Sequence, residues 1–285
     1  MRPGNAVNRR EFVAGLGGLA AAATPLSRLV SRFPFPVSRI EKIGLQLYTV
    51  RGLMAKDFHG TLAEVAKIGY REVEFAGYFG HTPKDVRAAL GMHGLSAPSA
   101  HMPFERIRSG WDQVLDDART VGHEYVVVAW IPEEERRTAD GWRRVGELFT
   151  SAGEKTRAAG MQFAFHNHNY EFTPVEGRIP YDILLESSDR SLVQFEMDLY
   201  WITSGKGDPL AYFKQYPGRF PCVHVKDMDA AGKMVDVGTG TIDWKRIFAQ
   251  SGQAGIRHYF VEHDEPAVPF DSIRASYEYL KRLEF

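Results

Sequence analysis

From Ile43 to the C-terminal end, short apolar runs alternate with amphipathic segments, and this alternation constrains the fold more than any other feature of the chain. Strict alternation of strands and helices is typical of a parallel sheet covered by helices. The predicted strands are Ile43–Tyr48, Glu72–Ala76, Leu95–His101, Tyr125–Trp130, Gln162–His168, Leu192–Leu199, Phe220–Lys226 and His258–His263. The predicted helices are Phe58–Ile68, Pro83–His93, Trp111–Val121, Trp142–Ala159, Tyr181–Ser188, Pro209–Gln215, Trp244–Gln250 and Ser272–Leu283.

Eight such units of roughly 27 residues each fit a closed (β/α)₈ barrel, a TIM barrel, in a single domain. A doubly wound open sheet is the structural alternative. It is disfavoured because no glycine-rich phosphate-binding loop follows the first predicted strand. Helix starts are marked at Thr82-Pro83 and Asp208-Pro209, where a capping side chain precedes a proline at the first helical position.

The N-terminal segment differs from the rest of the chain. Asn8-Arg9-Arg10-Glu11-Phe12-Val13 resembles the twin-arginine export motif, and a run rich in Gly and Ala follows as far as Ala23. That run is too short to span a membrane as a helix. We therefore expect residues 1–23 to be a signal peptide, 24–41 a linker and 42–285 the barrel domain. The alternatives for the first segment are a disordered basic tail or an uncleaved anchor.

Export by the twin-arginine translocase would place the mature protein in the periplasm or otherwise outside the cytoplasm, without stable membrane insertion. The net charge is −1, so bulk charge gives no case for binding nucleic acid or anionic membranes. The single cysteine, Cys222, excludes an intramolecular disulfide. Its apolar surroundings in the sequence favour a buried hydrophobic role over a nucleophilic one.

Polar side chains end the last four predicted strands, at the edge of a barrel where active sites lie. Because side chains alternate along a strand, the apolar residues can be assigned to the outer face and the polar ones to the interior. The inward set is His166, His168, Glu196, Asp198, His224, Lys226 and Glu262. Such groups are costly to bury unpaired, and a shared cation removes that cost. Taken singly, each has a structural alternative: a hydrogen-bonded core histidine, a helix cap at Asp198, or an ion pair between Glu262 and Lys226.

These strand ends carry the motifs Phe165-His-Asn-His-Asn-Tyr-Glu-Phe172, Met197-Asp-Leu-Tyr-Trp201, His224-Val-Lys-Asp227 and Val261-Glu-His263. From about Lys42 to Leu283 the chain resembles the xylose isomerase-like TIM barrel superfamily, in the sugar phosphate isomerase/epimerase group. The resemblance implies a divalent metal held by Asp198, His224 and Glu262. The group's strand-five glutamate has no counterpart. His166 stands there and is the expected fourth ligand, with His168 and Glu171 nearby as alternatives.

Mn²⁺ is the metal first expected, but imidazole and carboxylate ligands also suit Zn²⁺, Co²⁺, Fe²⁺ or Mg²⁺. The resemblance further implies a sugar isomerase or epimerase that removes a proton next to a carbonyl through an enediolate. The expected catalytic residues are His166, His168, Glu171 and Glu262. The expected substrate-binding residues are Glu74, His101, Trp130 and Lys226. Structural pairing or simple packing is the alternative for each of this second set.

A histidine in place of one of the two carboxylate bases puts symmetric two-base epimerisation in doubt. One base with a metal suits elimination from a 3-keto-glycoside equally well. The third alternative is a non-catalytic, exported sugar-binding barrel, and an endonuclease of the endonuclease IV type is disfavoured by export and the acidic mature chain. The expected partner is a small sugar, without phosphate because the protein is exported. A homodimer is a further expectation.

Overall fold

The computed structural model describes residues 38–285. The predicted signal peptide, residues 1–23, lies outside the described residues, as does most of the predicted linker. Within the described part, Ser38 exchanges two backbone hydrogen bonds with Phe285, with N–O distances of 2.9 and 3.1 Å. The first described residues therefore pair with the last residue of the chain. Among residues 38–285, no helix is long and apolar enough to cross a membrane.

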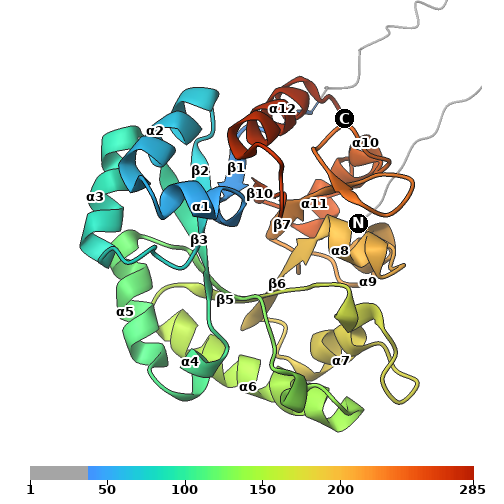
Figure 1. Ribbon diagram of the computed structural model, residues 1–285. Coiled ribbons are helices and arrows are strands. Elements are labelled where there is room, and N and C mark those ends of the chain that lie inside the picture. The colour runs from blue at the N-terminus through green and yellow to red at the C-terminus, as the bar shows by residue number, and fades with distance from the viewer. Residues whose placement is uncertain (1–37) are drawn as a thin grey trace, which may run out of the picture. The chain divides into compact units, whose positions relative to one another are not determined.

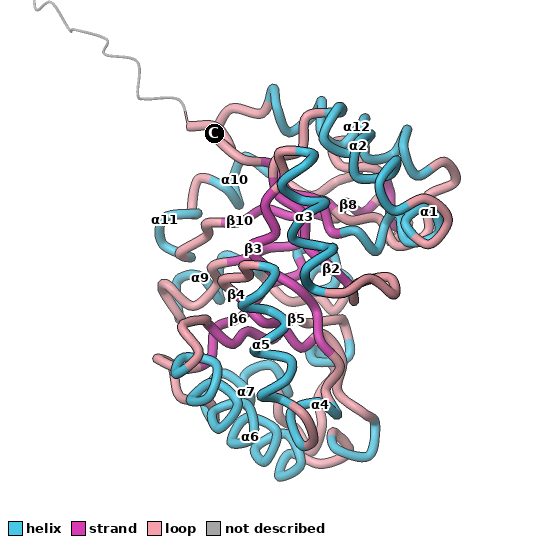
Figure 2. The backbone as a smooth tube through the Cα atoms, turned by 90° about the vertical axis from the view of Figure 1, so that its left-hand side faces the viewer, coloured by secondary structure: helices cyan, strands magenta, loops and turns pink. Residues whose placement is uncertain are grey.

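Eight parallel strands close into a barrel in the order β1-β10-β7-β6-β5-β4-β3-β2, which confirms the predicted fold. Figure 1 shows the strands at the centre with helices around them, and Figure 2 shows the same strands from the side. The strands are β1 (Ile43–Gln46), β2 (Glu72–Ala76), β3 (Ser96–Met102), β4 (Tyr125–Val128), β5 (Gln162–His166), β6 (Val193–Asp198), β7 (Cys222–Val225) and β10 (His258–Val261).

The main outer helices lie where the amphipathic pattern predicts them, to within three residues at their starts. They are α2 (Phe58–Ile68), α3 (Pro83–His93), α5 (Trp111–Val121), α6 (Ala139–Ala158), α7 (Pro180–Ser187), α9 (Pro209–Gln215), α10 (Trp244–Phe248) and α12 (Pro269–Arg282). Shorter helices that the pattern did not predict are α1 (Arg51–Met54), α4 (Glu105–Arg108), α8 (Leu199–Ser204) and α11 (Ser251–Ala254). They lie in loops, where short segments carry too little periodicity to be recognised.

Alternation along the strands divides the core into two parts. Phe163 and Phe165 of β5 pack outward on Phe149 of α6, with ring centroids 5.0 and 5.2 Å apart. Inside the barrel a small apolar cluster fills the middle, made up of Tyr125, Val127, Ala164, Cys222 and Phe260. Cys222 is therefore a buried interior hydrophobe, as predicted. This apolar layer closes the barrel below the polar ends of the strands.

The loop after β7 contains an antiparallel hairpin that the sequence did not predict, β8 (Asp227–Met228) with β9 (Met234–Val235). Its first residue, Asp227, is buried and organises the loop. Its carboxylate accepts hydrogen bonds from the backbone N–H groups of Gly238 and Gly240 and from the indole N–H of Trp244. Asp227 in the His-Val-Lys-Asp motif is thus a loop-forming residue.

Two helical glycines, Gly153 and Gly91, offer a matched test of how closely α6 packs against the start of β6. A Cβ at Gly153 of α6 would lie 2.6 Å from the backbone oxygen of Leu192, whereas a Cβ at Gly91 of α3 would meet nothing within 4 Å. We expect Gly153→Ala to lower the free energy of unfolding by roughly 1–3 kcal/mol, because backbone must move. Gly91→Ala should raise it by up to about 1 kcal/mol through helix propensity. Urea denaturation of both variants tests this, and equal effects would contradict the close approach.

Candidate metal centre

The carboxyl ends of six strands bring polar side chains together above the apolar layer of the barrel. Nearly all of these side chains are buried, and His101, the most accessible of them, keeps only 15% of its side chain exposed. They are Glu74 on β2, His101 on β3, His166 on β5, Glu196 and Asp198 on β6, His224 on β7, Lys226 just after β7 and Glu262 just after β10. The inward orientation predicted from strand alternation is what brings them together. These side chains form two layers, called here the upper and the lower tier, and the imidazoles of His166 and His224 contact carboxylates of both.

The upper tier contains Asp198, His224 and Glu262, with one ligand atom from each lying within 4.8 Å of the others. His224 Nδ1 is 2.6 Å from Glu262 Oε2 and 3.9 Å from Asp198 Oδ2. His166 Nε2 lies 3.7 Å from the same Asp198 oxygen. Three of the four residues predicted as metal ligands therefore form one group, and His166 adjoins it through Asp198.

The lower tier holds the same two imidazoles from the other side. His224 Nε2 lies 2.6 Å from Glu74 Oε2, and His166 Nδ1 lies 3.2 Å from Glu196 Oε2. A carboxylate on the far nitrogen of a metal-binding histidine fixes its tautomer and orientation. Here Glu74 binds Nε2 of His224, and Glu196 binds Nδ1 of His166. The other nitrogen of each ring, His224 Nδ1 and His166 Nε2, therefore points to the upper tier. His101 Nε2 joins the two carboxylates, 2.7 Å from Glu196 and 3.2 Å from Glu74.

Burial and charge set the protonation of these groups. Burial lowers the pKa of His101, but the carboxylates of Glu74 and Glu196 outweigh it and raise the pKa to about 9. Burial likewise opposes a charge on His224, yet Glu196, Glu262 and Glu74 raise its pKa well above the usual value. Charge-assisted hydrogen bonds to carboxylates therefore hold His101 and His224 in the lower tier. A metal bound at His224 Nδ1 would displace the proton from that nitrogen. Burial raises the pKa of Asp198 to about 6, although Lys226 and His224 act to lower it.

Lys226 is a buried cation between three carboxylates. Its Nζ lies 2.9 Å from Glu262 Oε2, 3.1 Å from Asp198 Oδ2 and 2.9 Å from Asp264 Oδ1. Burial lowers its pKa, but these carboxylates outweigh that effect and raise the pKa well above the usual range. Lys226 therefore stays charged and partly neutralises the upper tier.

A cavity of 320 Å³ opens above the two tiers. It is lined by Tyr48, Ala76, His101, Ala129, Trp130, His166, His168, Trp201, Lys226, Glu262 and Asp264. Burial lowers the pKa of His168 to about 3, with Lys226 adding to the effect, so its ring is neutral at physiological pH. Its Nδ1 is buried without a hydrogen-bond partner in the described part of the chain. A neutral imidazole with a free nitrogen thus lies beside the metal ligands.

Two of the residues predicted to act in catalysis or substrate binding, Glu74 and Glu171, do not line the cavity. Glu74 is fully buried in the lower tier, where Ser99 donates to one carboxylate oxygen and Gln46 Nε2 lies 2.7 Å from the other. Glu171 is fully buried in the loop after β5 and accepts the backbone N–H of His168 at 2.9 Å. Six of the predicted residues line the cavity, namely His101, Trp130, His166, His168, Lys226 and Glu262, whereas the predicted ligands Asp198 and His224 are fully buried and do not line it. Their individual roles remain predictions.

Asp264 was missed as a site residue by the sequence reading. Its signal was present, because Asp264 follows Glu262 by two positions and so lies on the same side of the extended segment. Strand alternation also places Glu196 in the interior, where its carboxylate contacts His101 and His166. Its position two residues before Asp198 on β6 puts it one tier lower, which becomes visible only when the register of neighbouring strands is known.

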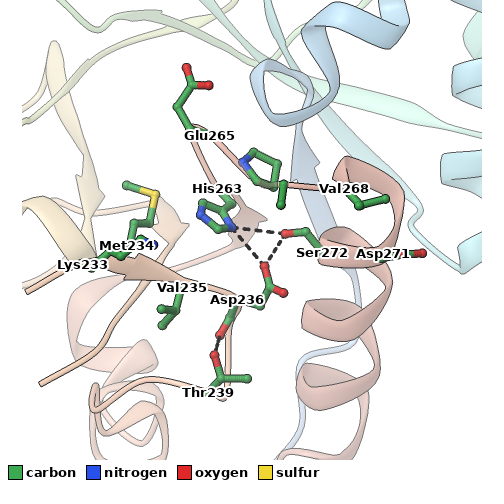
Figure 3. Close-up of a pocket in the computed structure, with 12 residues that line it drawn as sticks. Lys233, Met234, Val235, Asp236, Thr239, His263, Glu265, Val268, Asp271 and Ser272 are labelled. Atoms are coloured by element: carbon green, nitrogen blue, oxygen red, sulfur yellow. Dashed lines mark hydrogen bonds and ion pairs between the residues drawn. The ribbon is translucent and has the colours of Figure 1, made fainter. Parts of the chain in front are cut away.

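The other side of the segment after β10 lines a second cavity, of 480 Å³. Figure 3 shows His263 directed at Asp236 and Ser272, with Nδ1 3.0 Å from Asp236 Oδ1 and 3.3 Å from Ser272 Oγ. The serine hydroxyl donates to the aspartate rather than to a histidine acceptor. This arrangement does not activate a nucleophile. It ties the segment that carries Glu262 and Asp264 to α12 and to the loop after β9.

The chemistry of the upper tier fits a divalent cation. Asp198 Oδ2 is buried and accepts no hydrogen bond of good geometry in the described part of the chain, although Lys226 Nζ is near it. Two carboxylates and two imidazoles form a mixed N/O set of the kind that binds first-row divalent metals. The lower tier supplies the outer partners that such histidines require.

A closed barrel of parallel strands with this polar cluster at its carboxyl end defines the class of the protein as a TIM barrel with a candidate metal centre. The family model described as xylose isomerase-like TIM barrel matches residues 62–283, so the chain belongs to that family of sugar-processing barrels. The predicted family is therefore confirmed.

Curated relatives and solved structures agree with this membership. The chain is 22% identical to the inosose dehydratase of Lacticaseibacillus casei, over 78% of this chain and 88% of that protein. It is 24% identical to the inosose dehydratase of Geobacillus thermodenitrificans, over 79% and 89%. A sugar phosphate isomerase/epimerase from Parabacteroides distasonis superposes with a TM-score of 0.77 at 28% identity, over 85% of this chain and 98% of that one. The zinc-bound IolI protein shares the fold, with a TM-score of 0.70 at 16% identity, over 83% and 95%.

Replacing Asp198 by asparagine tests the upper tier without breaking the local fold. Asp198 Oδ1 also caps α8 by accepting the backbone N–H of Trp201 at 2.8 Å, and an asparagine oxygen can keep that bond. We expect Asp198→Asn to weaken Mn²⁺ binding on the order of 100-fold, because an anionic ligand is lost. Calorimetric titration of the EDTA-treated protein measures this. The matched control is Asp208→Asn, which changes the exposed cap of α9; equal affinity in both variants would exclude Asp198 as a ligand.

Glu171 should make stability depend on pH. Burial raises its pKa to about 8, whereas an unfolded chain has a glutamate pKa of about 4.3. The folded state therefore binds the extra proton, and the free energy of unfolding falls as pH rises from about 5 to 8, by at most about 1.4 kcal/mol per pH unit. Glu171→Gln keeps a neutral acceptor for the His168 N–H and should lose less stability over this range. Urea denaturation at pH 5.5 and 8 compares the two; identical pH slopes would contradict the raised pKa.

Proposed function

We propose that this chain is a metal-dependent enzyme that removes the proton next to the carbonyl of a keto-sugar, and that the reaction ends in elimination. The observation that carries the proposal is the neutral His168 ring, which lines one cavity with two candidate metal ligands, His166 and Glu262, and with cationic Lys226. A base, a cation-binding set and a fixed positive charge are the groups that such a proton transfer requires.

His166, Asp198, His224 and Glu262 would hold the metal. A bound divalent cation would supply Lewis-acid polarisation of the substrate carbonyl. Mn²⁺ is our first choice, and Zn²⁺, Co²⁺, Fe²⁺ or Mg²⁺ are the others. Glu74 and Glu196 hold the two imidazoles in place from below, so that their upper nitrogens stay available.

His168 is the proposed base. Its neutral imidazole takes the proton from the carbon next to the carbonyl, and the C–H electron pair forms an enolate whose negative charge lies on the carbonyl oxygen. The C–O bond to the group on the following carbon then breaks, and that group leaves as an alcohol or water with the proton that His168 removed. In a 3-keto-glycoside, the proton comes from C2 and the group leaves from C1. Lys226 stabilises negative charge that develops on oxygen.

Elimination is favoured over two-base epimerisation by the content of the cavity wall. His166 stands where a second carboxylate base is expected, and Glu262 is ion-paired with both Lys226 and His224. Glu171 lies behind the loop and accepts the His168 N–H, so we assign it a positioning role. The inosose dehydratase relatives support this choice, since a dehydratase eliminates water. Isomerisation by the same proton transfer is the second candidate, supported by the Parabacteroides distasonis isomerase/epimerase.

Export by the twin-arginine route to the periplasm is part of the proposal. It is supported by the motif at Asn8–Val13, which lies outside the described residues. Two acidic side chains, Glu262 and Asp264, line the cavity, and its lysine is already paired with them. A phosphorylated sugar would bring further negative charge to this wall. An unphosphorylated substrate, of the kind met outside the cytoplasm, fits it better.

Proton NMR in D₂O tests the reaction. Metal-loaded protein is mixed with unphosphorylated ketoses and 3-keto-glycosides, beside EDTA-treated protein and the His168→Gln variant. We expect loss of the substituent at C1, and a decrease in kcat of about 100-fold or more in His168→Gln, because the base is removed. The matched control is His59→Gln, at an exposed position on α2.

Each outcome of this experiment separates the candidates. Deuterium incorporation with an intact carbon skeleton would indicate an isomerase or epimerase instead. Ligand binding that survives EDTA, without exchange or turnover, would favour a non-catalytic sugar-binding barrel. Full activity in His168→Gln would exclude His168 as the base.

A further inference from the structure

Exposed aromatic side chains gather at the mouth of the cavity. Among residues 38–285, four large hydrophobic side chains are exposed: Tyr48 (40%), Met92 (71%), Trp130 (53%) and Val268 (55%). The two aromatic ones both line the cavity above the metal ligands. Large apolar rings left in water at one site are typical of a binding surface.

Each of these rings is backed by an arginine. The guanidinium carbon of Arg136 lies 4.0 Å from the ring centroid of Tyr170 and 5.2 Å from that of Trp130. Its Nε donates to the backbone oxygen of Ile131 at 3.0 Å. Trp130 and Tyr170 also contact each other edge to face, with centroids 5.4 Å apart. Cation–π contact and the backbone hydrogen bond together hold Trp130 in one orientation.

Arg51 does the same for Tyr48. Its guanidinium carbon lies 4.0 Å from the Tyr48 ring centroid. Its Nη1 donates to the backbone oxygens of Tyr48 and Asp264 at 2.9 and 2.7 Å, and its Nη2 pairs with Glu265 at 2.5 Å. Arg51 thus makes three hydrogen bonds within the protein, which hold its guanidinium over the Tyr48 ring.

The barrel places the two rings on different sides of the opening. Tyr48 follows β1 and Trp130 follows β4, and β2 and β3 lie between these strands in the closed sheet. The candidate metal ligands Asp198 and His224 are fully buried, whereas His168 and Trp201 line the cavity together with the two exposed rings. A sugar whose carbonyl reaches the floor would therefore have any second ring between Tyr48 and Trp130.

We infer that Tyr48 and Trp130 form a second ring-binding subsite, positioned by Arg51 and Arg136, and that the substrate is a neutral sugar joined to a ring with a flat apolar face. This rests on the proposed function, because it takes the metal centre as the place of the reacting sugar. Aromatic side chains stack on such faces, which both an aryl group and a second sugar ring possess. The ring would be the group that elimination releases.

Binding to the metal-loaded full chain tests the subsite without turnover. Calorimetric titration compares methyl β-glucoside, phenyl β-glucoside, cellobiose and glucose 6-phosphate. We expect phenyl β-glucoside or cellobiose to bind about tenfold more tightly than the methyl glycoside. The phenyl and cellobiose arms distinguish an aryl ring from a sugar ring as the occupant.

Variants assign the effect to these residues. Trp130→Ala should lower the affinity for the ring-bearing probe to that for the methyl glycoside. Arg136→Gln, which does not line the cavity, should weaken the ring-bearing probe alone by about fivefold, and Arg136→Lys should restore part of it. Arg137→Gln, in an exposed ion pair with Glu133, is the matched control. Thermal melting checks that each variant is folded.

Three results would overturn the inference: equal affinities for the methyl and ring-bearing probes, no measurable binding of either ring-bearing probe, or tightest binding of glucose 6-phosphate. A ring preference that depends on Trp130, found without turnover of any keto-glycoside, would retain the subsite and reject the proposed reaction. Turnover without a ring preference would retain the reaction and reject the subsite.

Discussion

Carboxylate and imidazole groups, buried together at the carboxyl end of the barrel, are the constraint on which the site depends. Glu74 and Glu196 would be costly to bury as anions; His101 compensates that cost as a hydrogen-bonded cation, and His224 Nε2 adds a hydrogen bond to Glu74. The same contacts orient the imidazoles of His224 and His166 toward Asp198 and Glu262. The hydrogen bonds that stabilise the buried charges are therefore also the ones that orient the candidate metal ligands.

The cavity wall contains two kinds of side chain, charged ones and uncharged aromatic ones. One side carries carboxylates already paired with Lys226, and the other carries the neutral ring of His168 among aromatic side chains. In the proposed reaction, His168 would transfer the proton and Lys226 would stabilise the developing charge. The aromatic mouth, with its rings held by arginines, extends the apolar side outward. Each part belongs to a loop after a different strand, which is how this fold varies its chemistry while keeping its core.

The fold and the main cluster were predictable from the sequence because both follow from short-range periodicity. Period-two alternation on β5, β6 and β7 assigned His166, Asp198 and His224 to the interior before any register was known. The division into tiers was not predictable, since it depends on how neighbouring strands are staggered. The burial of Glu171 behind its loop, the β8–β9 hairpin and the stacking of Arg136 on Trp130 depend on tertiary contacts between segments without periodic patterns.

The segment from Glu262 to Glu265 lies between two cavities, with Glu262 and Asp264 lining one and His263 and Glu265 lining the other. Because alternate residues point to opposite sides, inserting or deleting one residue there would exchange both sets at once. The candidate ligand would turn toward α12, and the histidine that anchors the segment would turn into the metal centre. Evolution can therefore change this stretch by substitution but not by insertion or deletion of a single residue.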